Sequence, residues 1–142
     1  MKKIASLLTV AAVAATSLAL VSCSKEAPKA EVIKIGVFEP LTGANGAGGA
    51  DEVDGIKLAN KLFPEVLGKK VELVVVDNKS DKVEAANAAT VLAQKEKVNA
   101  VIGSWGSSLS MAGGPIFAEA KIPAVAVSAT NPNVTKGNDY YF

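Results

Sequence analysis

The sequence predicts an α/β fold built on a doubly wound parallel sheet, with helices on both faces. The first observation is that short apolar runs alternate with helical patterns along the chain, which favours βαβ units and therefore parallel strands. The second is that residues 73–76, Leu-Val-Val-Val, are apolar without interruption, as expected for a strand buried on both faces. The third is that small polar turns follow two of the runs, at the edge where open α/β sheets bind ligands.

Apolar runs and helical spacing assign the elements in chain order from residue 32. The predicted strands are 32–38, 70–77, 98–102 and 124–127, with 140–142 as the start of a fifth. A glycine-rich turn, 39–49, leads into a helix over 51–63, which Pro64 and Gly68 end. Ser80 or Asp81 caps a second helix that runs to about Glu96, and the third helix covers 109–119.

Charge and composition exclude several classes of function. The chain has 15 basic residues, all lysines, and 14 acidic residues. The resulting formal net charge of +1 gives no basic patch of the kind that binds nucleic acid. The chain has no histidine, which removes Ser-His-Asp catalysis, Cys-His catalysis and histidine-ligated zinc from it. Its single cysteine has no intrachain partner for a disulfide, so the position of that cysteine is more informative than its redox chemistry.

The N-terminus predicts export. A basic start, Met1-Lys-Lys, precedes an apolar run over 4–21, and together residues 1–22 have the layout of a signal peptide. The alternative is a retained membrane anchor, because the run is close to the shortest length that spans a bilayer. Residues 20–23, Leu-Val-Ser-Cys, resemble the lipobox of bacterial lipoproteins, so we predict lipidation at Cys23. Residues 23–31 then form the lipidated cysteine and a flexible tether.

The acidic and glycine-rich segments do not form a nucleotide or metal motif. The glycines of the turn 39–49 lie at positions 43, 46, 48 and 49, so no G-x-G-x-x-G fingerprint can be drawn, although Asp77 ends the second strand where a ribose-binding acid would lie. Asp77 and Asp81 lack the further ligands of a calcium loop. We interpret the turn as a flexible loop over a ligand cleft, and Asp51, Glu52 and Asp54 as acids that complement a helix dipole.

Two hydroxyl-bearing turns form the candidate site. Ser107 and Ser108 stand where the third helix needs a cap, and a helix N-terminus presents free N–H groups at which carboxylates settle. Ser128 and Thr130 follow the fourth strand, so both turns lie at the carboxyl edge of the sheet. Trp105 precedes Ser107 and belongs either to the core or to a pocket wall. The alternative is that these residues only cap and turn the chain.

Several stretches carry a resemblance to a known family. They are 33–43 (Ile-Lys-Ile-Gly-Val-Phe-Glu-Pro-Leu-Thr-Gly), 54–59 (Asp-Gly-Ile-Lys-Leu-Ala), 71–77, 101–103 with Ser107-Ser108, and 122–130. With these, the chain resembles the Leu/Ile/Val-binding protein family over residues 32–142. These proteins are extracytoplasmic solute receptors of branched-chain amino-acid ABC importers, with the type I periplasmic-binding-protein fold.

The resemblance implies a receptor, not an enzyme, without a cofactor. Two lobes would close on a free amino acid and deliver it to ABC permease subunits, from a monomer held on the membrane by its lipid anchor. It places the ligand carboxylate at Ser107 and at the hydroxyl and N–H of Thr130, and the ammonium at the Ser128 carbonyl. Gly48 and Trp105 depart from the family pattern beside the ligand side chain.

The resemblance also implies that the chain supplies only part of one lobe. Because the sequence stops within its last apolar run, we expect 32–142 to be the N-terminal part of the first lobe of a longer protein. The alternative is a small complete domain with 140–142 as an edge strand. Two other functions stay open: a nucleotide-dependent α/β enzyme, and a ligand-sensing domain of the same fold.

Overall fold

The structure is a computed structural model that describes residues 31–142. The predicted signal peptide at 1–22 and the predicted lipidation at Cys23 lie outside the described residues. Among the described residues, no helix has both the length and the apolar character to cross a membrane.

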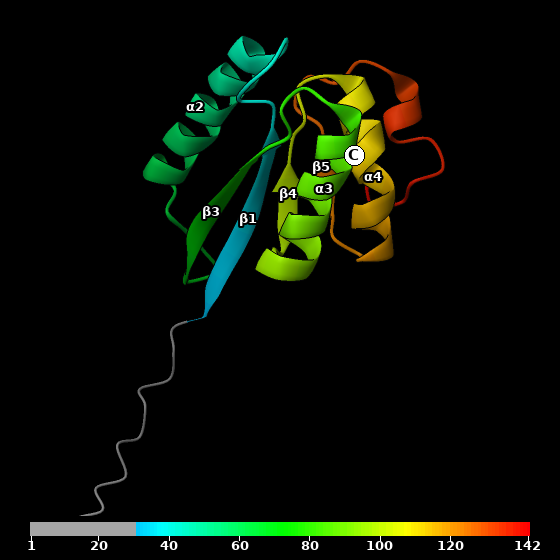
Figure 1. Ribbon diagram of the computed structural model, residues 1–142. Helices are drawn as coiled ribbons and strands as arrows, with labels where there is room; N and C mark the ends of the chain where they lie inside the picture. Colours follow the sequence, from blue (N-terminus) through cyan, green and yellow to red (C-terminus); the bar gives the residue numbers. More distant parts are fainter. Residues whose placement is uncertain (1–30) are drawn as a thin grey trace, which may run out of the picture.

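A five-stranded sheet with the order β2-β3-β1-β4-β5 forms the centre of the domain (Figure 1). Four strands are parallel: β1 (Val32–Glu39), β3 (Lys69–Asp77), β4 (Ala100–Ile102) and β5 (Ala124–Val125). The predicted parallel sheet is therefore confirmed. It also has a short antiparallel edge strand, β2 (Glu65–Val66), which the sequence analysis missed. Leu67 and Gly68 make the tight turn between β2 and β3, both with positive φ.

Helices cover both faces of the sheet, as predicted. Helix α2 (Gly46–Leu62) lies against one face. Helix α3 (Lys82–Thr90), its π-helical continuation η1 (Val91–Glu96) and α4 (Ser107–Glu119) lie on the other, where α3 and α4 pack together (Figure 1). A 3-10 turn, η2 (Pro132–Val134), follows β5. Of the two predicted caps of the second helix, Ser80 and Asp81, the N-cap is Asp81, whose Oδ1 accepts the N–H groups of Val83 and Glu84 at 2.8 and 3.0 Å.

Helix α2 starts earlier than predicted. The prediction of a glycine-rich loop over 39–49 is wrong in its second half, because Gly46 already begins the helix. Glycine is needed at position 49 because the helix backbone passes close to the loop at Pro40: a Cβ on Gly49 would lie 2.0 Å from the carbonyl oxygen of Pro40. Because the helix starts there, Asp51, Glu52 and Asp54 lie beyond its first turn, where the helix dipole no longer favours acids.

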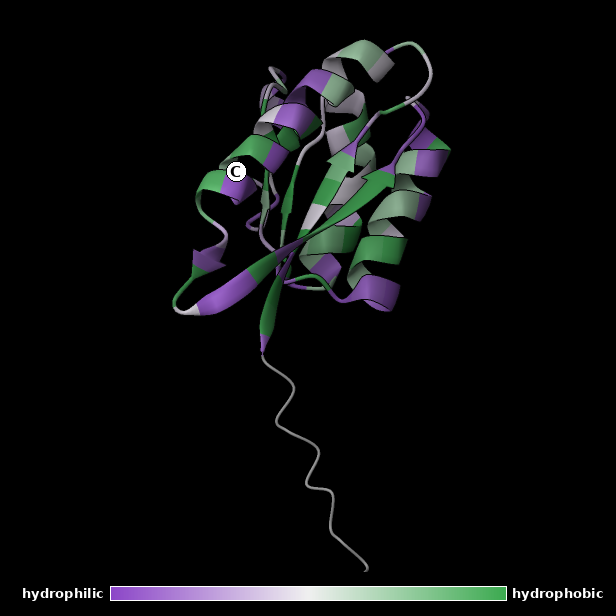
Figure 2. Cartoon of the chain, turned by 90° about the vertical axis from the view of Figure 1, so that its left-hand side faces the viewer, coloured by the Kyte–Doolittle hydropathy of each residue, from purple (hydrophilic) through white to green (hydrophobic). Residues whose placement is uncertain are grey.

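The core lies mainly between the sheet and the pair α3–α4. Phe38 of β1 and Phe117 of α4 meet edge to face, with ring centroids 5.5 Å apart. Small residues allow this packing: a Cβ on Gly113 would lie 2.9 Å from the Phe38 ring, and α3 turns three alanines inward. Tyr141 completes the cluster from a parallel bridge to Ala124; of the strand predicted to start at 140–142, the described residues form this one bridge. Figure 2 shows the apolar residues gathered along the central strands.

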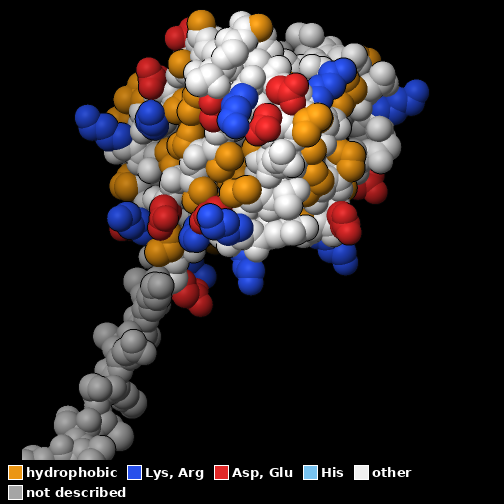
Figure 3. Space-filling model, viewed as in Figure 1, with side chains coloured by type: hydrophobic (Ala, Val, Ile, Leu, Met, Phe, Trp, Pro, Cys, Tyr) orange, Lys and Arg blue, Asp and Glu red, His pale blue; other side chains and the backbone are white. Residues whose placement is uncertain are grey.

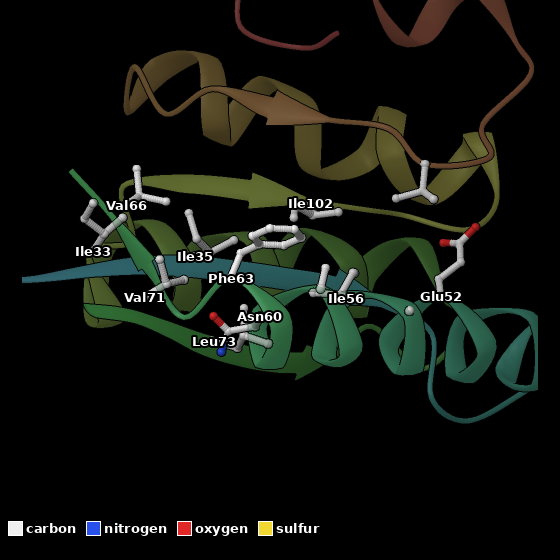
Figure 4. Close-up of a pocket in the computed structure, with 13 residues that line it drawn as sticks. Ile33, Ile35, Glu52, Ile56, Asn60, Phe63, Val66, Val71, Leu73 and Ile102 are labelled. Carbon is white, nitrogen blue, oxygen red and sulfur yellow. The ribbon is translucent and has the colours of Figure 1, made fainter. Parts of the chain in front are cut away.

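The face under α2 is less well filled. A groove of about 570 Å³ runs between α2 and the sheet, lined by apolar side chains that include Ile33, Ile35, Phe63 and Leu73 (Figure 4). Phe63 lies over the sheet between Ile35 and Ile102 and is still 74 % exposed. Figure 3 shows hydrophobic side chains at the surface on the side of α2 and β3. The prediction that 73–76 is buried on both faces is therefore wrong, since Val75 on this face is exposed.

Candidate functional site

A hollow of about 300 Å³ lies at the carboxyl edge of the sheet, between the loops that follow β4 and β5. Its walls are Trp105, Gly106, Ser107, Ser128 and Thr130. These loops come together because β4 and β5 are parallel neighbours, paired at Val101 and Ala124. The structure thus brings four of the predicted ligand-binding residues into one hollow, and leaves Ser108 outside it, exposed on α4.

Ser107 has a different local role from the one predicted. The N-cap of α4 is Gly106, whose φ of 96° suits glycine, and Ser107 is the first helical residue. The Ser107 Oγ accepts two backbone N–H groups from the second loop, those of Thr130 and Asn131, each at 3.1 Å. Ser107 therefore ties the two loops together, and the Thr130 N–H expected to face a ligand is donated to it.

The hollow still presents donors to a ligand. A serine hydroxyl has two acceptor lone pairs and one donor hydrogen, so the Ser107 hydroxyl that accepts two bonds keeps its hydrogen free to donate. The N–H groups of Ser107 and Ser108 stand at the start of α4, ahead of the first intrahelical bond, which Leu109 or Ser110 makes to the Gly106 carbonyl. A hydroxyl and a helix N-terminus at one wall of a hollow suit a carboxylate.

A buried polar layer that sequence reasoning missed supports the first loop. Asn78 Nδ2 donates to Ser104 Oγ at 2.9 Å, and the Ser104 N–H donates to Ser110 Oγ at 3.2 Å; all three residues are fully buried. Gly103 needs its positive φ and its missing side chain here, because a Cβ would lie 2.1 Å from the Phe38 carbonyl oxygen. This layer could have been found in the sequence, because Asn78 and Ser104 are polar residues that follow the apolar strands directly.

Trp105 is part of the hollow's wall. Of the two interpretations of its side chain, the structure favours the pocket wall, because the residue is 37 % exposed and lines the hollow. Its indole lies against the first turn of α2, where a Cβ on Gly48 would come within 2.5 Å of Nε1. Its backbone N–H donates to Glu39 Oε2 at 2.6 Å. Gly48 thus leaves the space that the indole occupies.

Asp77 is committed to the loop after β1. Its Oδ1 accepts the N–H groups of Leu41 and Lys79, at 2.8 and 2.7 Å, and its Oδ2 accepts the Thr42 hydroxyl at 2.6 Å. Burial alone would raise the pKa of this carboxyl, but the hydrogen bonds from Thr42, Leu41 and Lys79 outweigh it and lower the pKa. Asp77 therefore holds a loop in place and is not a free acid for a ribose. Within 31–142, no cluster of three metal-binding side chains is present.

A sequence model described as "Periplasmic binding protein" matches residues 32–142. The "Amino acid binding protein" of Pseudomonas aeruginosa is 33% identical over 107 residues, which cover 73% of this chain and 29% of the relative. The leucine binding protein LivK of Thermotoga maritima is 46% identical with a TM-score of 0.75, covering 77% of this chain and 31% of that structure. LivJ of Streptococcus pneumoniae, solved with isoleucine, is 36% identical with a TM-score of 0.75, covering 79% and 33%.

The chain thus spans about a third of the length of the proteins it matches. The matched region coincides with the sheet, its helices and both loops of the hollow. The agreement of sequence and fold over this region shows that the chain belongs to the periplasmic binding protein family.

Proposed function

We propose that residues 32–142 are the N-terminal part of the first ligand-binding lobe of an extracytoplasmic substrate-binding protein, which takes an amino acid to the permease of an ABC importer. The observation that carries the proposal is the hollow, where the Ser107 hydroxyl and the first N–H groups of α4 converge. The printed names of the relatives, and the isoleucine bound in the Streptococcus structure, support an amino-acid ligand, branched-chain or similar.

The ligand carboxylate binds at Ser107, and the Thr130 hydroxyl adds a further donor from the second loop. The Ser128 carbonyl accepts from the ligand ammonium, and an acid from a second lobe balances that charge. Hydrogen bonds to a charged group contribute about 1.5–3 kcal/mol each, so a small number of such contacts is enough for tight binding once the lobes exclude water.

The ligand side chain points toward Trp105. The indole stands between the hollow and Gly48, so it limits the shape of the side chain that fits. Carboxylate recognition and side-chain selection then rest on different residues, and separate variants test them.

The test measures affinities of the full-length protein for a panel of amino acids, together with thermal melts. We expect Ser107→Ala or Thr130→Ala to weaken binding by roughly 10- to 100-fold for every amino acid bound, because the carboxylate is common to all. Trp105→Ala should instead change the ranking among amino acids. Ser108→Ala is the matched control, since this serine lies one residue away and outside the hollow.

A purely structural role of Ser107 predicts a different result. If Ser107 only ties the loop of Thr130 and Asn131 to α4, Ser107→Ala lowers the melting temperature and leaves every affinity unchanged. That outcome removes Ser107 from the ligand site.

The N-terminal part of the proposal is tested separately. Residues 1–22 are removed as a signal peptide, Cys23 carries lipid, and residues 23–31 tether the domain to the membrane. Cys23→Ala should release the protein from the membrane fraction or block its processing. Mass spectrometry that finds an unmodified Cys23 in a soluble product contradicts the lipid anchor.

A further inference from the structure

Glu39 is a fully buried acid that is hydrogen-bonded to the backbone of Trp105, one of the residues that line the hollow. It ends β1, and its side chain is 0 % exposed. Its Oε2 accepts the Trp105 N–H at 2.6 Å, so it holds the loop that leads to Ser107. Its Oε1 is buried and has no hydrogen-bond partner among the described residues. A lone buried carboxylate with an unpaired oxygen costs much free energy, so a further partner is expected.

The partner is a second carboxyl group. Residues at odd positions of β1 face α2, as Ile33 and Ile35 do, and α2 carries Glu52, which is near enough to act on the pKa of Glu39; Figure 4 shows Glu52 pointing away from α2 at the end of the groove. Glu52 Oε2 is also buried without a hydrogen-bond partner among the described residues. Two facing carboxyl groups cannot both be charged at low cost, whereas one proton held between them gives each group a partner.

We propose that Glu39 and Glu52 share one proton, and that Glu39, through the Trp105 N–H, is a positioning residue that makes ligand affinity at the hollow depend on pH. The coupling to affinity rests on the proposed function. With one proton on the pair, the two carboxyl groups together carry a single negative charge, and Glu39 still accepts the Trp105 N–H. Once that proton leaves, a second negative charge lies behind the place proposed for the ligand carboxylate and repels it.

Other titratable groups near Glu39 have their own partners. Tyr141 donates its hydroxyl to the Gly103 carbonyl, and burial, together with the charge of Glu39, raises its pKa to about 12, so it stays protonated. Asp77 lies opposite Glu39 in the β1–β3 register, but its carboxylate accepts hydrogen bonds from the Leu41 N–H and the Thr42 hydroxyl. Burial is the largest cause and raises the pKa of Glu39; the Trp105 N–H, second in size, lowers it, and the Glu52 carboxyl raises it further, so that the pKa is about 8.

The experiment compares four full-length proteins: wild type, Glu39→Gln, Glu52→Gln and the control Glu65→Gln. The amide that Glu39→Gln introduces keeps the size of the side chain and an acceptor for the Trp105 N–H, and it cannot ionise. Glu65 lies on β2 opposite Lys70, at the other end of the parallel strands, so its removal changes the charge equally without touching the hollow. Leucine and isoleucine affinities are measured from about pH 6 to about pH 9.5, a range that brackets the titration of a buried carboxyl pair.

We expect the ratio of the wild-type dissociation constant to that of Glu39→Gln to be constant below about pH 7 and to rise roughly threefold to tenfold above about pH 8. Taking the ratio cancels the titration of the ligand's own amino group. Glu65→Gln should follow the wild type, and Glu52→Gln should move the transition to lower pH. A ratio that stays constant over the whole range overturns the coupling.

Trp105 fluorescence gives a readout that needs no ligand. After subtraction of the signal of Trp105→Phe, the wild-type emission should change with a midpoint at the pKa of Glu39, about 8, and that of Glu39→Gln should not change. No transition in the wild type, or the same transition in Glu39→Gln, refutes the shared proton. A transition at Glu39 in a protein that binds no amino acid refutes the proposed function and leaves the carboxyl pair in place.

Discussion

The two faces of the sheet differ in how well their aromatic and aliphatic side chains are buried. On the face covered by α3 and α4, Phe38 and Phe117 are 0 % exposed and Tyr141 is 2 % exposed. On the α2 face, Val75 is 37 % exposed and Phe63 is 74 % exposed. The same strands supply both faces, since successive residues of β1 and β3 point to opposite sides. The difference therefore reflects how much of each face has a covering element. The first face has two packed helices, and the second has one helix beside an apolar groove (Figure 4).

The groove and the exposed Phe63 and Val75 form an apolar surface on which further chain can pack. The chain spans about a third of the length of its relatives, and we propose that further residues of the complete first lobe cover the α2 face. In that case, the α3–α4 face is finished within 32–142 and the α2 face is not.

The largest expected effect is on the isolated segment 32–142. With the α2 face open and no second lobe, it should be only marginally stable, bind a fluorescent hydrophobic dye, and bind amino acids weakly or not at all. Urea unfolding, dye titration and calorimetry measure these properties, with the full-length protein as the control. Micromolar binding of an amino acid by the isolated segment contradicts this account.

The next effect separates the two faces by mutation. In the isolated segment, Phe117→Ala removes about 3–5 kcal/mol of unfolding free energy through the cavity left beside Phe38 and Tyr141, so this marginally stable segment should be unfolded without urea. Phe63→Ala removes a ring of the same size and should cost less than about 1 kcal/mol, because that ring is already largely in water. Equal costs at the two positions would show that the two faces are packed alike.

The same contrast explains which parts of the fold could be predicted from the sequence. Hydrophobic periodicity depends on local spacing, so it located the four parallel strands and the helices on both faces but missed the two-residue edge strand β2. It also predicted that the strand at 73–76 is buried on both faces. A run of valines does not show whether a helix packs against the second face of the strand. The start of α2 was missed because glycines usually break helices, whereas Gly49 is required by its contact with Pro40.

The candidate site shows a similar limit. Because parallel strands bring their carboxyl ends together, the sequence placed Ser107, Ser128 and Thr130 at one edge. The cross-link from Ser107 to Thr130 and Asn131 depends on how two loops meet in space, and no local pattern encodes it. The Glu39–Glu52 pair was missed for the same reason: Glu52 was interpreted from its place in a helix, while its partner lies on a strand.

A moderate effect is expected at Asp77, whose side chain faces the α2 side and fixes the loop before α2. Asp77→Asn should destabilise the protein by about 1 kcal/mol near neutral pH, since it weakens hydrogen bonds that solvent partly screens. A lowered folded-state pKa means that the stabilisation is present above the usual pKa and is lost as pH falls through the folded value. The difference between the two proteins should therefore shrink in acid, as measured by urea unfolding at a series of pH values. A difference that does not change with pH would assign the loss to packing instead of charge.

The smallest effect is expected at Leu67, in the hairpin turn that borders the open face. This leucine is 91 % exposed and has a φ of 53°, a conformation in which a bulky side chain is strained and asparagine is not. In the isolated segment, Leu67→Asn should therefore stabilise the domain by about 0.5–1 kcal/mol. If further chain covers this edge in the complete protein, the same substitution removes a buried apolar contact there and should be neutral or destabilising. Urea unfolding of both forms gives the sign in each, and stabilisation by the same amount in both would show that the hairpin stays in water and that the cover ends before it.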